Sequence, residues 1–210
     1  MTIKRLLPLS GIVFVVLVLA TSIALNSDAP TSTATGAEVA TYYAENEIAQ
    51  GIGSFLIAAA VLFLVLFAVA LASLAPHDDK RLWERVLVGG SVLAGTIFLI
   101  TGIVNFALVD GATNDASEEA LQALSLFLGD NWVGFNAGLG VMMIGAAGTL
   151  LARPRAHAAL GWTALVLGIA LFIPFVDFIA LLLTAIWIIV ASVVLFRTTK
   201  RDVAVAVPDA

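Results

Sequence analysis

The chain contains no cysteine, and charged residues make up only 12% of its 210 residues. Without cysteine there are no disulfides, thiolate metal sites or cysteine nucleophiles. Soluble domains carry charge on roughly a quarter of their residues, whereas 61% of this chain is hydrophobic and its mean hydropathy is +1.07. The densest basic cluster is only Arg197 to Arg201, so no nucleic-acid surface is expected. This composition predicts an integral membrane protein in contact with a lipid bilayer.

The apolar stretches contain no Lys, Arg, His or Glu near their middles. Ionisable residues within a membrane usually mark proton relays, ion paths or substrate sites, so a proton pump and a retinal protein are disfavoured. The sequence also has no HExxH, P-loop, dinucleotide or nucleophile-elbow motif. The only histidines, His77 and His157, fall in two separate polar turns and are interpreted as solvated. We therefore expect no enzyme activity, catalytic residue, metal or cofactor.

The placement of the basic residues predicts how the chain crosses the membrane. An apolar run of ~20 residues spans ~30 Å of hydrocarbon, and all ten Lys and Arg residues fall on one side of a single threading. The segments on the other side hold ten acids and no base, which is the positive-inside pattern. We predict an all-α, polytopic membrane helix bundle with six transmembrane helices, both termini cytoplasmic, in a bacterial plasma membrane. The single domain, 1–210, has spans at 6–25, 51–74, 85–109, 132–151, 158–173 and 177–196, and external segments at 26–50 and 110–131.

Two of these spans have an alternative interpretation. The first is predicted to be an uncleaved anchor, although a signal peptide cleaved near Ala29 is the alternative. The last apolar stretch, 158–196, is too long for one crossing, and Pro174 interrupts it because proline disfavours helix at the preceding residue. One bent helix would leave Arg197 outside. A tight hairpin with Pro174 to Asp177 at the outer surface returns it to the inside and is preferred.

Both external segments are predicted to contain short helices. Thr35 and Glu38 have the spacing of a capping box, and the helix they begin is expected to continue into the second span with kinks at Gly51 and Gly53. The second short helix is expected to start at Asp115 or Ser117 and to end at Gly129. Its apolar stripe is predicted to lie along the outer membrane interface; the stripe comprises Leu121, Leu124 and Leu128.

Aromatic residues fall near the predicted membrane boundaries, as interfacial belts require. Tyr42, Tyr43 and Trp132 are predicted at the outer boundary. Trp187 is the exception, because it falls near the middle of the sixth span, and it is interpreted as a packing residue.

Three acids, Asp110, Asp130 and Asp177, are predicted at the outer rim beside helix ends. Together with Asn131 they are candidates for an external cation site, since carboxylate and carbonyl oxygens suit Ca²⁺ or Mg²⁺. The alternative is that Asp177 caps the sixth span and that Asp130 or Asn131 caps the fourth.

Three uncharged polar residues lie within the third and fourth spans: Thr101, Asn105 and Asn136. A buried amide needs a partner, so hydrogen bonds between these two helices are expected. The alternative is a polar path for a solute.

Small residues recur at a four-residue spacing in the fourth span, where Gly134 and Gly138 form a GxxxG pattern. This pattern allows helix backbones to approach closely in lipid. The contact is expected either within the chain or with a protein partner or second copy.

The run Arg5-Leu-Leu-Pro-Leu opens the first span, and Thr35-Gly-Ala-Glu-Val-Ala-Thr-Tyr-Tyr precedes the second. With the hairpin layout, these features resemble a family of actinobacterial multi-pass membrane proteins classified as a domain of unknown function. The resemblance covers most of the chain and implies no activity or site.

Two classes of function remain. The first is a non-enzymatic scaffold, sensor or accessory subunit, which a dry, closely packed interior would favour. The second is a small transporter or channel for a neutral or apolar solute, which a continuous polar cavity reaching Asn105 would favour.

Overall fold

The structure is a computed structural model of the chain, and it describes residues 6–25, 29–73, 80–152 and 157–205. Within these ranges the side chains of residues 24, 80, 81 and 198–205 lie outside the description. The described residues are helical nearly throughout and form no strand. The prediction of an all-α membrane-type fold is therefore confirmed at this level.

The described part of the chain contains eight α-helices and one 3-10 turn. In chain order they are η2 (Leu7–Leu9), α1 (Ser10–Leu25), α2 (Gly36–Glu45), α3 (Glu47–Ala72), α4 (Lys80–Thr113), α5 (Glu118–Asp130), α6 (Trp132–Leu151), α7 (Ala158–Ala170) and α8 (Asp177–Val205). Four segments are long and apolar enough to cross a membrane: Glu47–Ala72, Leu82–Thr113, Glu118–Leu151 and Asp177–Arg197. The apolar helices Leu7–Ile23 and Ala158–Ala170 are shorter.

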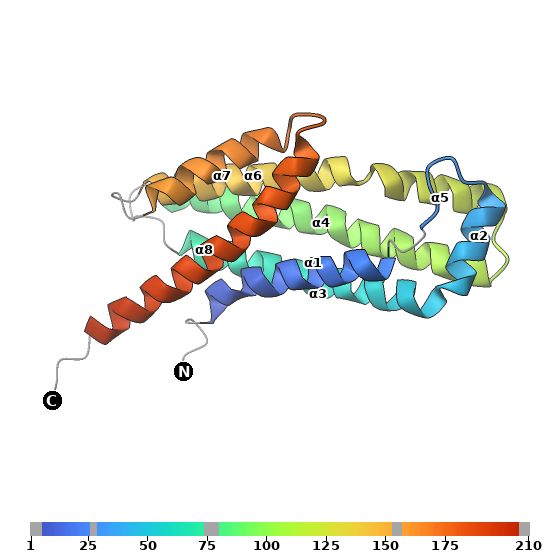
Figure 1. Cartoon of the computed structure of the whole chain (residues 1–210), viewed down its shortest axis with the longest axis horizontal. Coiled ribbons are helices and arrows are strands. Elements are labelled where there is room, and N and C mark those ends of the chain that lie inside the picture. Colours follow the sequence, from blue (N-terminus) through green and yellow to red (C-terminus); the bar gives the residue numbers. More distant parts are fainter. Residues whose placement is uncertain (1–5, 26–28, 74–79, 153–156, 206–210) are drawn as a thin grey trace.

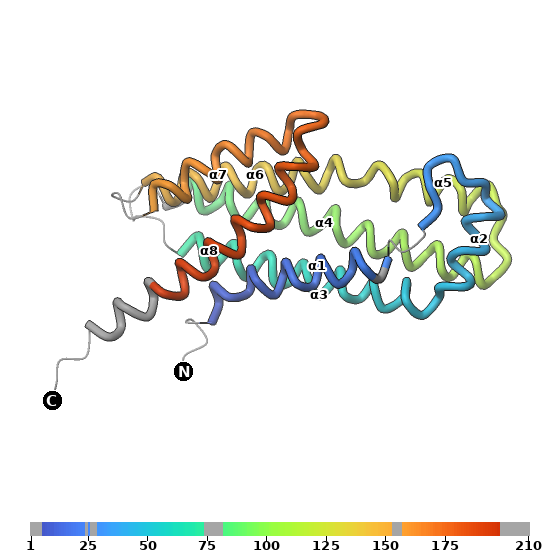
Figure 2. The backbone as a smooth tube through the Cα atoms, in the orientation of Figure 1, coloured from blue at the N-terminus to red at the C-terminus, as the bar shows by residue number. Residues whose placement is uncertain are grey.

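The helices form an elongated bundle in which α1, α3, α4 and α6 run along the long axis (Figure 1). One end, called here the acidic end, is covered by α2 and α5 and carries Glu38, Glu45, Glu47, Glu118 and Glu119. The opposite end, called the basic end, is where α4 passes Arg85 and α8 reaches Arg197. The tube in Figure 2 runs from α5 almost straight into α6.

The helices α4 and α6 pack antiparallel with their backbones in contact. A Cβ atom added to Gly138 would meet Ala94 Cα at 2.6 Å, and one added to Gly90 would meet Met142 Cα at 2.7 Å. Near the basic end the same approach occurs between Gly145 and Leu87. Lipid supplies no hydrophobic drive between helices, so such close van der Waals packing holds them together. The GxxxG glycine Gly138 therefore makes its contact within the chain.

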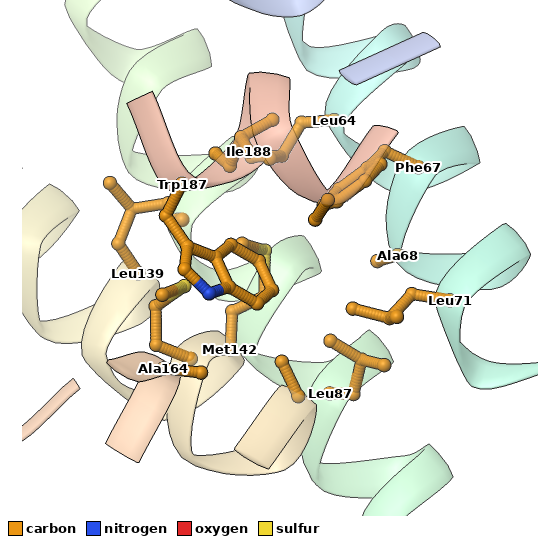
Figure 3. Packing of buried hydrophobic residues seen from close by; sticks show 14 of the residues in the cluster. Leu64, Phe67, Ala68, Leu71, Leu87, Leu139, Met142, Ala164, Trp187 and Ile188 are labelled. Carbon is orange, nitrogen blue, oxygen red and sulfur yellow. The ribbon is translucent and has the colours of Figure 1, made fainter. Parts of the chain in front are cut away.

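The largest apolar cluster occupies the half of the bundle nearer the basic end (Figure 3). Trp187 lies at its centre, edge-on to Phe67 with ring centroids 6.5 Å apart, and its Nε1 donates to the Leu160 carbonyl oxygen at 3.0 Å. The apolar ring of the indole is packed and its N–H group has an acceptor, which confirms that Trp187 is a packing residue. The cluster leaves this half of the bundle closely filled.

The first short helix, α2, begins as the sequence predicts. Thr35 N–H donates to Glu38 Oε2 at 2.7 Å, while Glu38 N–H donates to Thr35 Oγ1 at 3.3 Å, which completes the capping box. These bonds hold the pKa of the exposed Glu38 carboxyl below its usual value. The predicted continuation of this helix into the second span is wrong, because α2 ends at Glu45 and α3 begins at Glu47 on the other side of Asn46; Gly51 and Gly53 both lie inside α3.

The second short helix, α5, begins with Ser117 as its N-cap, whose hydroxyl accepts from Ala120 N–H at 3.3 Å. It ends at Asp130, one residue beyond the predicted Gly129. Its apolar stripe does not face the interface as predicted. Leu121 is buried in a second cluster with Val39, Tyr43, Leu108 and Val109, because α2 and α4 offer it a protein surface.

The chain reverses between α7 and α8, so this stretch is a hairpin and not one bent helix, but the predicted position of its turn at the outer surface is not shown. α7 packs on α6, with Gly168 near Gly140, and α8 returns to cross α1, where Ser192 lies beside Gly11. The 13 residues of α7 measure about 20 Å, so its turn lies part-way along the bundle (Figure 1). As a result, α7 and α8 fill only part of the bundle's length.

Candidate functional site

A cavity of about 430 Å³ lies beneath α2 and α5, and the first turns of α8 reach its wall at Leu181. Walls are contributed by α1, α3, α4, α5, α6 and α8, together with Tyr43 of α2. Its lining includes Val18, Thr21, Ser22, Leu25, Tyr43, Ile57, Phe98, Thr101, Asn105, Ser125, Leu128, Asn131, Trp132, Phe135 and Leu181. None of the described residues in this lining is charged.

Asn105 reaches this cavity and is held by α3. Its Nδ2 donates to the Gln50 carbonyl oxygen at 3.1 Å and to Ser54 Oγ at 3.0 Å. The sequence predicted hydrogen bonds between the third and fourth spans, but for Asn105 this is wrong. Its position on α4 faces α3, which offers both the Ser54 hydroxyl and the Gln50 carbonyl oxygen as acceptors.

Thr101 does join the third and fourth spans, through a residue that the sequence assigned to capping. Asn131 Nδ2 donates to Thr101 Oγ1 at 2.6 Å and to the Ile97 carbonyl oxygen at 3.2 Å. Asn131 is the N-cap residue of α6, yet its side chain makes no capping bond there. Its amide instead clamps the beginning of α6 onto α4 at the cavity wall.

Tyr43 of α2 lines the cavity on the side of the acidic end. Its side chain is only 4% exposed, so it is a buried residue and not part of the interfacial belt predicted for it. Burial raises the pKa of Tyr43 to about 12, with the neighbouring Tyr42 adding to the effect. The hydroxyl of Tyr43 is therefore protonated at neutral pH and can donate a hydrogen bond.

The last turn of α1 is fixed beside the cavity by a polar cluster. Tyr42 Oη donates to the Leu25 carbonyl oxygen at 3.0 Å, and Gln50 Nε2 donates to Tyr42 Oη at 2.8 Å. Gln50 Oε1 is buried and accepts no hydrogen bond in the structure. The carbonyl at the end of α1, which helix geometry leaves without an intrahelical donor, is thereby satisfied.

Thr21 lies in the wall of the cavity and carries a buried hydroxyl without a partner. The residue lies on α1, is 4% exposed, and its Oγ1 is buried with no hydrogen-bond partner. A buried hydroxyl without a partner costs roughly 1–3 kcal/mol. Sequence reasoning missed Thr21 and Ser125, and their only signal was a hydroxyl within an otherwise apolar run.

Asn136 and Asp177 pair deeper in the bundle. Asn136 Nδ2 donates to Asp177 Oδ2 at 3.1 Å, and the two residues are 2% and 5% exposed. The predicted partner of Asn136 on the third span is therefore replaced by one on α8. Both side chains are buried among the helices, and Asn136 lies about one helical turn inside the start of α6 at Trp132.

The three acids of the candidate cation site are not brought together. Asp110 and Asp130 are exposed near the acidic end, whereas Asp177 is buried against Asn136. Among the described residues, no group of three His, Asp or Glu side chains has the geometry to hold a metal ion. The arrangement therefore gives the cation hypothesis no support.

His157 lies immediately before α7 and is 7% exposed, with Nδ1 buried and unpaired. It is thus not the solvated loop residue that the sequence suggested. His77 lies outside the described residues.

Gly134 and Gly138 both face α4. An added Cβ at Gly134 would meet the Ile97 side chain at 3.3 Å, and one at Gly138 would meet the backbone of Ala94. The GxxxG face is therefore occupied inside one chain, and a second copy would have to use another surface.

No family model, curated protein or solved structure matches this chain. The chemistry of the cavity therefore follows from its own residues: hydroxyl and amide groups toward the acidic end, apolar walls below them, and no charge.

Proposed function

We propose that six helices of the chain lie in a bacterial plasma membrane, with the basic end in the cytoplasm. The described helices support this, because Arg85 and Arg197 lie at one end and the acids of α2 and α5 at the other. The reversal between α7 and α8 adds the fifth and sixth helices as a hairpin that enters the membrane from the basic end and returns to it. The layout also agrees with the resemblance to the actinobacterial family, and that membership is part of the proposal.

The short α7 is accommodated in this topology by a turn that lies within the lipid. Phe172, Ile173, Phe175, Val176 and Phe178 are all exposed there, and Phe175 is 96% exposed. Such an apolar surface suits hydrocarbon and not water. Backbone groups in lipid must be satisfied internally, and the N–H groups of residues 171, 172, 173, 176 and 177 all donate to backbone carbonyls in or before the turn.

The function that this geometry favours is a non-enzymatic membrane scaffold, sensor or accessory subunit. The observation that carries it is the closure of the half of the bundle nearer the basic end. There the α4 and α6 backbones touch at Gly90 and Gly145, and Met142, Met143 and Leu150 are almost completely buried. A solute entering at the cavity meets no opening through this packed region.

Transport of a neutral solute is the second candidate, and one observation favours it. The cavity reaches Thr101 and Asn105, two of the three residues for which the sequence suggested a polar path; the third, Asn136, is not among the lining residues. Transport would require the α4–α6 contact to open, which this structure opposes with backbone-to-backbone packing. The cavity is therefore assigned to binding and not to passage.

Cysteine labelling tests this assignment, because the chain has no cysteine of its own. We would place single cysteines at Ser125, in the cavity, and at Met142 and Met143, in the packed half. In oriented vesicles, a membrane-impermeant thiol reagent should modify the cysteine at Ser125 from the outside. It should leave those at Met142 and Met143 unmodified from both faces.

Solute flux gives the complementary measurement. Proteoliposomes carrying the protein should take up glycerol or urea no faster than empty liposomes. Protein-dependent uptake, together with modification of either methionine position from the cytoplasmic face, would replace the scaffold or sensor function with transport. Reaction at Arg85→Cys from outside intact cells would instead overturn the topology.

A further inference from the structure

We propose that the cavity beneath α2 and α5 binds an uncharged glycerolipid of the diacylglycerol type. The polar head would occupy the cavity, and the acyl chains would extend into the bilayer. This inference rests on the proposed function and specifies it, because a protein that senses or presents such a lipid needs a binding site and no passage. Four features of the cavity support it.

The first feature is the absence of charge. Among the described residues that line the cavity there is no Lys, Arg, His, Asp or Glu, although acids are plentiful at this end of the molecule. An anionic headgroup would find no cation to pair with, and burying an unpaired charge is far more costly than burying a hydroxyl. The lining therefore selects a head without charge.

The second feature is a change from polar to apolar lining along the bundle axis. On α4 the lining passes from Asn105 and Thr101 to Phe98, moving toward the basic end. On α6 it passes from Asn131 to Phe135 in the same direction. A ligand with a hydroxyl-bearing head and a hydrocarbon body matches this order, whereas a fully polar solute leaves the lower walls unmatched.

The third feature is hydrogen-bonding capacity that the protein itself leaves unused. Thr21 Oγ1 is buried without a partner, and a hydroxyl can both donate and accept. Tyr43 adds a phenol hydroxyl to the lining, which is protonated at neutral pH as in any tyrosine. Glycerol hydroxyls and ester carbonyls offer the complementary groups.

The fourth feature is access from the side. The main contacts of α1 are with α3 and α8, whereas α5 and α6 contribute the facing wall of the cavity. Ser22 and Trp132 lie on these two walls and are exposed. The volume of about 430 Å³ falls within the ~300–1,000 Å³ typical of ligand sites, and it suits a head with the first part of its chains.

Photo-crosslinking tests the proposal on the full-length protein in phosphatidylcholine vesicles. The probe is a diacylglycerol with a diazirine near the start of one acyl chain, and unlabelled dioleoylglycerol serves as competitor. We expect competable labelling of peptides containing Thr21, Ser125 or Leu181. A phosphatidylglycerol probe with the same diazirine chain should label these peptides at least several-fold less.

Variants connect this labelling to the cavity. Thr21→Val should raise the competitor concentration for half-maximal displacement about fivefold, the factor for one lost hydrogen bond, and Thr21→Ser should restore it. Thr149→Val is the matched control, because Thr149 is also buried with an unpaired hydroxyl but lines no part of this cavity. Ser125→Phe, which fills the cavity, should abolish competable labelling.

The outcomes separate this inference from the proposed function. Equal labelling by both probes, no competable labelling, or an equal effect of Thr149→Val would overturn lipid binding in the cavity. If Met142 and Met143 positions still resist the thiol reagent in that case, the scaffold or sensor function remains. Modification of those positions would refute the function whatever the lipid result.

Discussion

The contact between Gly138 and Ala94 gives the sharpest test of how the bundle is held together. Replacing Gly138 by alanine adds one methyl group where the structure leaves no room. The new Cβ would lie 2.6 Å from Ala94 Cα and 2.9 Å from Ala94 Cβ, whereas carbon atoms in contact normally lie about 3.5–4.0 Å apart. Because the obstacle includes backbone, no side-chain rotation relieves it, and α4 and α6 must separate by about 1 Å.

The expected cost follows from that separation. A gap of 0.5–1 Å forfeits about a quarter to a half of the dispersion energy of each affected contact, and overpacking of this kind typically costs about 1–3 kcal/mol. Alanine has a higher helix propensity than glycine, and this offsets the cost by up to about 1 kcal/mol. We therefore expect Gly138→Ala to lower the free energy of unfolding by about 1–2 kcal/mol.

Gly89→Ala is the matched control on the facing helix. Gly89 lies on α4, is exposed, and an added Cβ meets no atom within 4 Å. This variant gains the higher helix propensity of alanine without a steric clash, so its free energy of unfolding should be unchanged or rise by up to about 1 kcal/mol. Both variants would be unfolded reversibly by SDS in mixed micelles, with tryptophan fluorescence as the readout. Equal stability of Gly138→Ala and Gly89→Ala would refute the backbone contact.

Three further predictions concern the polar residues. Asp177→Leu should lower the free energy of unfolding by about 1–3 kcal/mol, because the buried Asn136 amide loses its acceptor; Asp177→Asn should recover part of this in the same SDS titration, and no difference between the two would contradict the pair. The pKa of Tyr43 is raised to about 12 in the folded protein, whereas in the unfolded chain it is near 10. As the pH rises above 10, the unfolded chain therefore loses this proton before the folded protein does. The free energy of unfolding should be constant below pH 10 and fall by up to roughly 2–3 kcal/mol toward pH 12. Absorbance at 295 nm, compared between the wild type and Tyr43→Phe, reports that ionisation, and a Tyr43 titration near 10 would show that the side chain is not buried. Thr35→Ala should destabilise α2 by about 1 kcal/mol and return the pKa of Glu38 toward its usual value, measured by NMR; an unmoved Glu38 would exclude the capping box.

Features set by neighbouring residues were predictable from the sequence. The capping box at Thr35 and Glu38, the N-cap at Ser117 and the break at Pro174 each depend on a few consecutive residues. The bounds of α6, Trp132 and Leu151, were likewise predicted, because polar residues and turns flank one uniform apolar run. Local chemistry is enough in these cases.

Features set by tertiary contact were not predictable in the same way. The sequence required a partner for Asn105, but only the rotation of α4 determines that the partner lies on α3. Helix α5 was expected at the lipid interface, because no sequence pattern indicates that α2 packs on its apolar stripe at Leu121. Thr21 had no distinguishing pattern at all, since a hydroxyl in an apolar helix usually bonds to its own backbone.

The length of α7 connects the packed half of the molecule to the cavity. Because this helix has 13 residues and ends about 20 Å from its start, the turn that follows cannot reach the acidic end. Helix α8 therefore starts part-way along the bundle, at the buried Asp177, and crosses diagonally toward α1 (Figure 1). The half nearer the basic end receives six helices and is filled. The other half receives four long helices, and the cavity occupies the space that a longer α7–α8 hairpin would have filled, with α2 and α5 as its cover.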